Sequence, residues 1–272
     1  MKTHYVLIAA LALTACAMPP VPPAPEASVD EEPIDIGILW VEYSAEYQAI
    51  TAQVYADALE DLPRLLADTS FSALPGQTDA ADKPAAIILD VDETVVSNAE
   101  YQETLRYAPY TRFGHFDWMR NNRAVPIRGA NALIEAAKAA GVEVFFLTNR
   151  ACERFEGIDG DCPYEQVTID DLREVGIETD ADRLLMAWEQ PGWSKEKRHR
   201  RDYIGQTHRV IGLYGDDYGD FVHCTRAKPL DPCTEPATRA SRHAALDTYA
   251  DYWGNGWYIL PNPMHGSWTS VR

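Results

Sequence analysis

The stretch IILDVDETVV, residues 87–96, carries apolar residues directly into three carboxylates, Asp90, Asp92 and Glu93. It continues the apolar run AAIILDV at 85–91, and a short continuous run of this kind is typical of a strand buried on both faces. Ionised carboxylates are costly to bury unless something compensates their charge. We therefore expect the strand to end here, with its carboxylates at a functional site.

Helical and strand patterns alternate on both sides of this strand. Apolar spacing, caps and composition predict helices over 44–67, 129–141, 168–176 and the basic segment 195–206. Apolar runs predict further buried strands over 142–149, 183–188 and 209–217. Helices that alternate with buried strands predict an α/β domain with a parallel sheet.

Three of the predicted strands end in polar residues: Asp90-Val91-Asp92, Thr148-Asn149-Arg150 and Gly215-Asp216-Asp217. In an open parallel sheet, ligands bind outside the carboxyl ends of the strands, so these residues are expected to converge. Carboxylates packed together remain ionised only around a cation. Hard oxygen ligands in an open site favour Mg²⁺.

A hydroxyl and an ammonium group beside such a metal would neutralise a phosphoryl group. Thr148 can supply the hydroxyl, and Lys195 or Lys197 the ammonium group. An aspartate near Mg²⁺ is a competent nucleophile toward phosphorus, and a second carboxyl can protonate the leaving alcohol and then activate water. The pattern favours phosphoryl transfer through an aspartyl-phosphate.

Four segments in order, IILDVDETV, FFLTNR, SKEKR and GDDYGDF, resemble the motifs of the haloacid dehalogenase superfamily phosphatases. The segments ILWVEYSAEY near the start and LPNPMHGSW at 260–268 resemble, more narrowly, the class C acid phosphatases, which are exported bacterial lipoproteins. The similarity covers residues 36–272. It implies one phosphatase domain over that range, with a haloacid dehalogenase-like Rossmannoid core, a parallel sheet and a small helical cap or accessory region.

The resemblance also implies roles for the motif residues. Asp90 would be the nucleophile and a metal ligand, and Asp92 the acid and base, with its backbone carbonyl on a single Mg²⁺ ion. Thr148 and Lys195 would hold the phosphate, and Asp216 would complete the metal site.

Two neighbouring carboxylates, Asp217 and Asp220, are expected to lie behind the metal ligands rather than on the ion. Lys195 is preferred to Lys197 because Lys195-x-x-Arg198 matches the spacing of the family. A solvated basic helix face is the alternative interpretation of these lysines.

Five further residues are expected to contact the substrate: Asn149, Arg198, Tyr101, Phe116 and His265. The family holds the leaving group between aromatic side chains, and those positions carry His115 or Phe116, and His265, where Trp and Tyr would be usual. Tyr101 and Phe116 are equally compatible with the hydrophobic core.

The N-terminal sequence indicates export. Residues 1–15 have a single early lysine, an apolar run and small residues, as in a secretory signal. Leu13-Thr14-Ala15-Cys16 resembles a lipobox, which implies lipidation of Cys16 and an outer-membrane lipoprotein facing the periplasm or the cell surface. An ordinary signal peptide with a chance cysteine is the alternative. Residues 16–35 then form a lipid anchor and a linker rich in Pro and acidic residues.

Composition limits the partners. The formal net charge of −18 argues against nucleic-acid polymers and against binding to anionic lipid headgroups, so membrane contact would be through the N-terminal lipid only. Because the protein is acidic overall, it could bind a phosphate ligand only with the help of a local metal ion, Lys or Arg.

Beyond Cys16 the chain has four cysteines, an even number that suggests disulfides in an exported protein. Proximity in sequence favours Cys152 with Cys162 and Cys224 with Cys233. Reduced thiols are the alternative, and neither pair has the short spacing of a zinc site.

These observations together predict an Mg²⁺-dependent acid phosphatase that hydrolyses small phosphomonoesters, with nucleoside 5′-monophosphates among the candidate substrates. Two alternatives stay open: a surface lipoprotein that only binds a cation or nucleotide, and a phosphotransferase that uses the same intermediate. The intact Asp92 argues against a purely binding role, because binding alone would not require that carboxyl.

Overall fold

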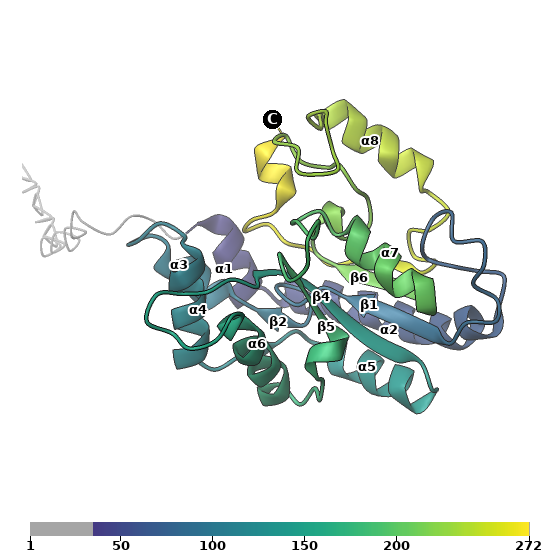
Figure 1. Ribbon diagram of the computed structural model, residues 1–272, viewed down its shortest axis with the longest axis horizontal. Coiled ribbons are helices and arrows are strands. Elements are labelled where there is room, and N and C mark those ends of the chain that lie inside the picture. Colours follow the sequence, from purple (N-terminus) through teal and green to yellow (C-terminus); the bar gives the residue numbers. More distant parts are fainter. Residues whose placement is uncertain (1–34, 272) are drawn as a thin grey trace, which may run out of the picture. The chain divides into compact units, whose positions relative to one another are not determined.

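Five parallel strands form the central sheet of the protein, whose computed structural model describes residues 35–271 (Figure 1). Their order in the sheet is β5 (Leu184–Ala187), β4 (Glu143–Ala151), β1 (Ala85–Leu89), β6 (Arg209–Gly215) and β7 (Trp257–Ile259). All four neighbouring pairs are parallel. The predicted α/β class with a parallel sheet is therefore confirmed.

The strand β1 is buried on both faces because its side chains alternate between two hydrophobic clusters. Ile87 and Leu89 pack in a cluster with residues of α2 (Ala45–Ala67), α5 (Ala130–Ala139) and α6 (Pro163–Glu174). Ile88 packs in the other cluster, which includes Ile204 of α7 (Arg198–Thr207). Helices thus cover both faces of the sheet, and the carboxyl ends of the strands remain the place where ligands can enter.

Most predicted elements are present, with shifted ends. The helix predicted over 44–67 is α2, and the side chain of Ser44 caps it by accepting a hydrogen bond of 3.0 Å from Tyr47 N. The predicted basic helix begins later than expected, at Arg198, so Lys195 and Lys197 lie in or at the end of the loop before α7. That loop geometry decides which of the two lysines reaches the site.

A small helical region accompanies the sheet, as the resemblance implied. It comprises α1 (Ile36–Tyr43), α3 (Ala99–Thr104), α4 (Arg112–Asn121) and a two-stranded sheet of β2 (Val96–Ser97) and β3 (Val125–Pro126). Sequence patterns did not predict β7 or the helix α8 (Arg239–Thr248), which has no buried residue. The strand β7 has only three residues, too few for a periodic pattern, and the amphipathic pattern of α8 was overlooked.

The structure joins Cys152 to Cys162 and Cys224 to Cys233, the pairs nearest in sequence. Among residues 35–271, no helix is both long enough and apolar enough to cross a membrane. The predicted signal peptide, Cys16 and the linker up to residue 34 lie outside the described residues.

Candidate active site

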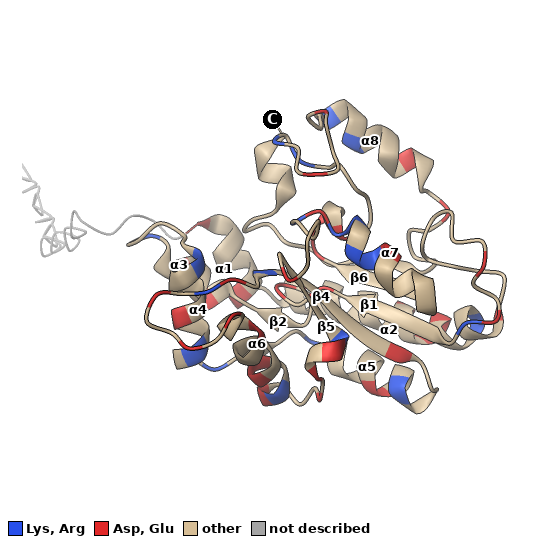
Figure 2. Ribbon diagram, in the orientation of Figure 1, with Lys and Arg blue, Asp and Glu red and all other residues tan. Residues whose placement is uncertain are grey.

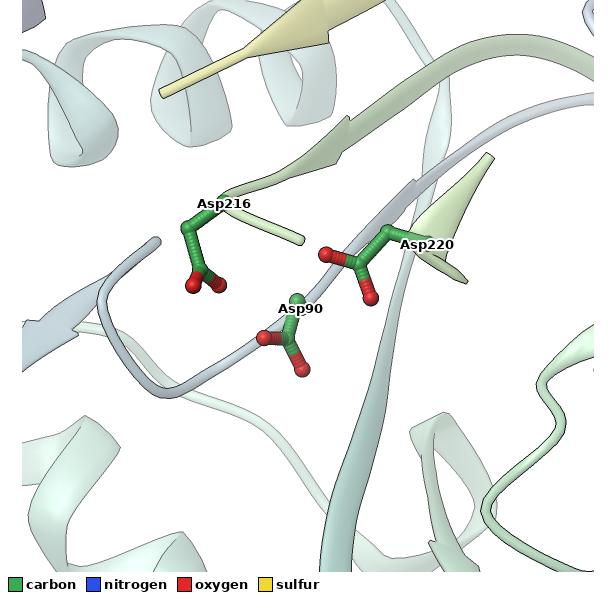
Figure 3. Close-up of side chains that lie close together, drawn as sticks. All are labelled: Asp90, Asp216 and Asp220. Atoms are coloured by element: carbon green, nitrogen blue, oxygen red, sulfur yellow. The ribbon is translucent and has the colours of Figure 1, made fainter. Parts of the chain in front are cut away.

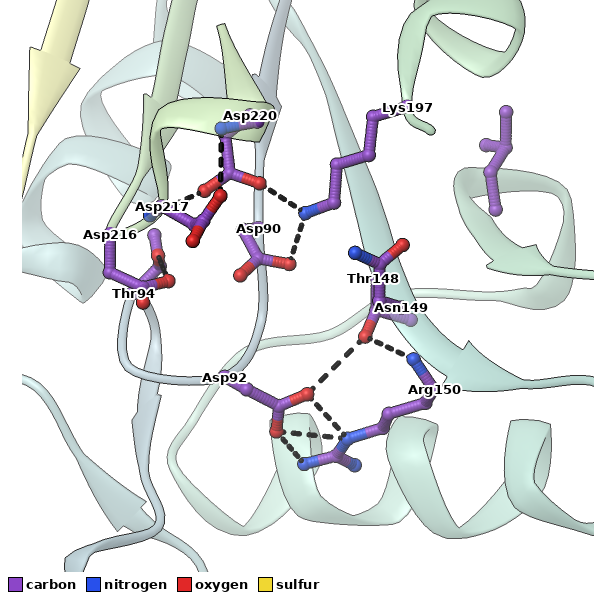
Figure 4. A network of polar contacts seen from close by, with 12 residues as sticks. Asp90, Asp92, Thr94, Thr148, Asn149, Arg150, Lys197, Asp216, Asp217 and Asp220 are labelled. Carbon is purple, nitrogen blue, oxygen red and sulfur yellow. Dashed lines mark hydrogen bonds and ion pairs between the residues drawn. The ribbon is translucent and has the colours of Figure 1, made fainter. Parts of the chain in front are cut away.

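Side chains that follow β1, β4 and β6 line one cavity of about 460 Å³ at the carboxyl edge of the sheet. Asp90 follows β1 directly, Asn149 and Arg150 lie near the end of β4, and Asp216 follows β6. The edge of the sheet thus brings together the three polar strand ends, as the sequence predicted (Figure 4).

Three carboxylates form a cluster in this cavity (Figure 3). One oxygen each of Asp90, Asp216 and Asp220 lies within 4.8 Å of the other two. Asp220 was expected to lie behind the metal ligands, but the 3₁₀ turn Tyr218–Asp220 carries its carboxylate into the cluster. Its Oδ2 also accepts a hydrogen bond of 2.9 Å from Asp217 N, which fixes the turn.

Burial and neighbouring carboxylates favour the protonated forms of Asp90 and Asp216 in this cluster. Burial, together with the nearby Asp220 and Asp92, raises the pKa of Asp90 to about 7 despite the opposing effect of Lys197. Burial followed by the charges of Asp220 and Asp90 raises the pKa of Asp216 well above its ordinary value. A divalent cation among these three hard oxygen donors would remove the repulsion, so the residues fit such an ion.

Lys197, rather than the expected Lys195, provides the ammonium group of the cluster. Its Nζ lies 2.5 Å from Asp90 Oδ1 and 2.6 Å from Asp220 Oδ1, and its side chain is 3% exposed. Burial acts to lower the pKa of Lys197, but the two carboxylates outweigh it and raise that pKa. The side chain of Lys195 instead lies over the ring of Trp188, at 5.8 Å from its centroid.

Asp92 belongs to a separate network, in which it pairs with Arg150 (Figure 4). The buried guanidinium lies 2.9 Å from Asp92 Oδ1 and 2.6 Å from Asp171 Oδ2. Asn98 Nδ2 also donates to Asp92 Oδ1 at 2.9 Å. Burial acts to raise the pKa of Asp92, but Arg150 outweighs it and holds that pKa below its ordinary value.

The predicted phosphate-binding segment lies between these two networks. Thr148 Oγ1 lies 3.4 Å from Asp92 Oδ2 and accepts a hydrogen bond of 3.1 Å from Arg150 N. Asn149 lines the cavity, and its side-chain oxygen accepts a hydrogen bond of 2.7 Å from Arg200 Nη2. The buried Arg200 therefore fixes the orientation of the Asn149 amide.

The C-terminal segment is tied to the carboxylate cluster through Asp216 and Asp217. Asn262 Nδ2 donates to Asp216 Oδ2 at 2.7 Å. Asp217 accepts hydrogen bonds from Gly219 N at 2.8 Å and from Ser267 through both its hydroxyl and its backbone N–H. These bonds outweigh burial and lower the pKa of Asp217, so this carboxylate is a structural anchor and not a fourth member of the cluster.

The residues predicted to contact the substrate are only partly brought to the cavity. His265 lines it, with Nε2 at 2.9 Å from Glu93 Oε2. Tyr101 and Phe116 are 4% and 2% exposed and pack away from the cavity lining, in agreement with the core alternative. Arg198 is exposed and pairs with Asp202 at 3.4 Å, outside the cavity lining.

His115 and Tyr110 occupy the aromatic side of the cavity instead. Burial lowers the pKa of His115 to about 4, and its Nδ1 makes a hydrogen bond with Tyr164. Tyr110 is 50% exposed and contacts Tyr101 edge to face. A larger cavity of about 630 Å³ lies beside α1, α3 and α4, but it contains none of the clustered aspartates, so its size does not make it the site.

Comparison with known proteins agrees with this geometry. The model of the HAD superfamily, subfamily IIIB (acid phosphatase), matches residues 30–268. The chain belongs to this acid phosphatase family. It is a phosphatase of the haloacid dehalogenase type, and therefore a phosphomonoester hydrolase.

Two solved structures show the same fold as this phosphatase. The class C acid phosphatase from Bacillus anthracis is 24% identical, has a TM-score of 0.67, and is matched over 86% of this chain and 85% of its own. The same enzyme with tungstate bound is also 24% identical with a TM-score of 0.67, over 85% of this chain and 84% of its own. The predicted family and enzyme class are confirmed by the family match.

Sequence reasoning missed the part played by Arg150 in the site of this phosphatase. A signal was present, because an arginine between Asn149 and the apolar Ala151 at a buried strand end must find a counter-charge. No sequence pattern indicated that Lys197 rather than Lys195 reaches the cluster, or that Asp220 joins it. Both depend on the geometry of the loops that carry them.

Proposed function

We propose that the phosphatase hydrolyses small phosphomonoesters in two steps with Asp90 as the nucleophile. The observation that carries this proposal is the contact of the Asp90 carboxylate with Lys197 at 2.5 Å, within the cluster that includes Asp216 and Asp220. An anionic nucleophile can approach an anionic phosphoryl group only where positive charge offsets the repulsion. Lys197 supplies that charge from the protein.

Asp90, Asp216 and Asp220 would hold one Mg²⁺ ion. Bound there, the ion would neutralise the carboxylates, keep Asp90 ionised and draw charge from the phosphoryl oxygens. Lys197 and Thr148 would contact the same phosphoryl oxygens from the side of the protein, and the Asn149 amide held by Arg200 would help to orient the ester.

In the first step, an oxygen of Asp90 attacks phosphorus and the bond from phosphorus to the ester oxygen breaks. The leaving alkoxide needs a proton, and Asp92 is the nearby carboxyl that can relay one. Because Arg150 keeps Asp92 ionised, we infer that the proton arrives with the substrate, as the monoanion of the ester below a pH of about 6. This requirement suits an enzyme that works in acid.

In the second step, water attacks the aspartyl-phosphate. Asp92 accepts a proton from that water, the bond between phosphorus and Asp90 breaks, and inorganic phosphate leaves. The ionised state that Arg150 imposes on Asp92 is the state that a general base needs. The same intermediate could pass its phosphoryl group to an alcohol, which product analysis in the presence of added alcohols would detect.

The test of this proposal is phosphate release from a panel of monoesters that includes nucleoside 5′-monophosphates. We expect release that requires Mg²⁺, is abolished by a chelator and is restored by added Mg²⁺. Rapid mixing should show a burst of alcohol ahead of phosphate if the aspartyl-phosphate accumulates. Full activity in the presence of excess chelator would refute the metal-dependent mechanism.

The proposed location is the bacterial outer membrane, through acylation of Cys16 as the lipobox resemblance suggests. The Cys16→Ser variant should then appear in the soluble fraction, while the intact protein sediments with membranes. A variant that remains firmly in the membrane pellet would contradict the lipoprotein assignment.

A further inference from the structure

Two cationic side chains line the active-site cavity but have no part in the mechanism above: Lys195 and Arg226. Lys195 lies in the loop before α7, and Arg226 lies in the loop closed by the disulfide between Cys224 and Cys233. Basic residues gather on α7 and just before it, in a chain whose formal net charge is −18 (Figure 2). The cavity lining also includes six carboxylates, so the role of these two cations has to be judged from their own contacts.

Lys195 has no carboxylate partner among residues 35–271. Its ammonium group lies over the ring of Trp188, and the carboxylate that acts on it from a distance, Glu153, is itself paired with Arg112 at 2.6 Å. By contrast, the carboxylates of Asp90 and Asp220 both pair with Lys197. Burial, then the charges of Arg226 and Arg112, lower the pKa of Lys195 and outweigh the opposing effect of Glu153, so the two arginines lie close enough to act on the ammonium group.

Arg226 is only weakly paired. Its Nε lies 3.8 Å from Glu196 Oε1, and that oxygen is buried without a hydrogen-bond partner in the described part of the chain. The charge of Arg226 also acts on Asp217, but the ion pair at 3.8 Å is longer than a hydrogen bond, so the guanidinium retains donors for a ligand. An ammonium and a guanidinium that face one cavity and lack close counter-ions together suit a phosphate or a carboxylate.

We propose that Lys195 and Arg226 bind a second anionic group of the substrate, so that the preferred esters carry a further phosphate or carboxylate beside the phosphate that is removed. The inference rests on the proposed function, because it concerns the specificity of the same site. Lys195 is thereby a specificity residue, and Lys197 is the lysine that contacts the transferred group.

Matched pairs of substrates test the inference. 3-Phosphoglycerate differs from glycerol 3-phosphate by a carboxylate in place of a hydroxymethyl group, and adenosine 3′,5′-bisphosphate differs from adenosine 5′-monophosphate by one phosphate. In at least one pair, we expect kcat/KM to be about tenfold higher for the ester that carries two anionic groups. A tenfold difference is about what one charge-assisted contact provides. The pair that shows the larger ratio tells whether a carboxylate or a phosphate is preferred.

The ratio of kcat/KM within a substrate pair should fall toward one in Lys195→Gln and in Arg226→Gln. Lys195→Arg should retain the ratio of the unmodified protein. Lys228→Gln is the matched control, since this exposed lysine lies in the same disulfide-closed loop as Arg226 but outside the cavity lining. The control should keep the ratio of the unmodified protein.

Several results would overturn the inference. One is a ratio near one in the unmodified protein for both pairs. Another is an equal loss of kcat on both members of a pair in Lys195→Gln, which would assign this lysine to the transferred phosphoryl group.

Titration of the Asp90→Asn variant with the same four esters measures binding without turnover. Preferential binding that depends on Lys195 would support the inference even if the proposed chemistry failed.

Discussion

Replacement of Arg150 by methionine is expected to destabilise the phosphatase strongly, and more so at neutral than at acidic pH. Arg150 is 1% exposed on its side chain and lies 2.9 Å from Asp92 and 2.6 Å from Asp171, which are 22% and 5% exposed. Removal of one partner from a buried ion pair costs about 3–5 kcal/mol, because it leaves charge buried without compensation. For a domain of this size that corresponds to a fall in Tm of about 10 °C.

The pH dependence follows from the two carboxylates. The pKa of Asp92 is lowered in the folded protein, so Asp92 contributes stability above its unfolded pKa of about 4, and that contribution falls away at lower pH. Burial raises the pKa of Asp171 to about 6 even with Arg150 present, and loss of the arginine would raise it further. Protonation of both groups should therefore reduce the cost of Arg150→Met as the pH falls from 7.5 to 4.5.

Urea unfolding under non-reducing conditions at pH 7.5 and pH 4.5 measures this difference. Arg173→Met is the matched control, because Arg173 pairs with Asp170 on the same helix, α6, with both side chains about half exposed. Exposed pairs contribute about 0.2–1 kcal/mol, so this control should change stability little. A loss in Arg150→Met below about 1 kcal/mol at pH 7.5, or equal losses at the two pH values, would refute the reasoning.

The remaining predictions concern the carboxylate cluster. Asp90→Asn should reduce turnover at least about a hundredfold while the fold is retained, because an amide is not a nucleophile toward phosphorus, and retention of activity would reassign the nucleophile. Gly215→Ala should weaken Mg²⁺ binding, because a Cβ at this position would lie 2.2 Å from Asp220 Oδ2 and displace that carboxylate. Calorimetric titration measures the affinity, and an unchanged value would contradict this prediction. Burial raises the pKa of Asp90 to about 7, so protons compete with the metal for this carboxylate. The affinity for Mg²⁺ should therefore increase from pH 5.5 to pH 8, and an affinity that does not change with pH would count against a protonated cluster.

The parts of the fold that could be predicted from sequence are those encoded in short continuous patterns. The run at 85–89 is short, continuous and apolar, which is typical of a strand buried on both faces. The edge strand β7, Trp257–Ile259, has three residues and depends on pairing with β6, so its own sequence carries little information. Local patterns therefore predicted the three central strands and the edge strand β5, which has an apolar run of its own, but not β7.

The same distinction applies to the site. The place of Asp90 and Asp216 at the cavity could be predicted because each directly follows a recognisable strand, whereas Thr148 lies inside β4 and stays a prediction. Lys195 and Lys197 are two residues apart in a loop, and no periodic rule says which side chain points into a cavity. Phe116 was expected at the substrate because the family resemblance implies an aromatic clamp, with His115 as the alternative, and it is His115 that lines the cavity.

The hydrogen bonds from Asn262 to Asp216 and from Ser267 to Asp217 also bear on biogenesis. Both bonds join residues far along the chain to motif residues that follow β6. A nascent chain that ends before residue 262 has Asp90, Lys197 and Asp220 but lacks both Asn262, which holds Asp216, and Ser267, which holds Asp217. During synthesis these groups follow the rest of the site, so the contacts they make are added last. Full activity should therefore arise only once the segment with Asn262 and Ser267 has been synthesised and has docked.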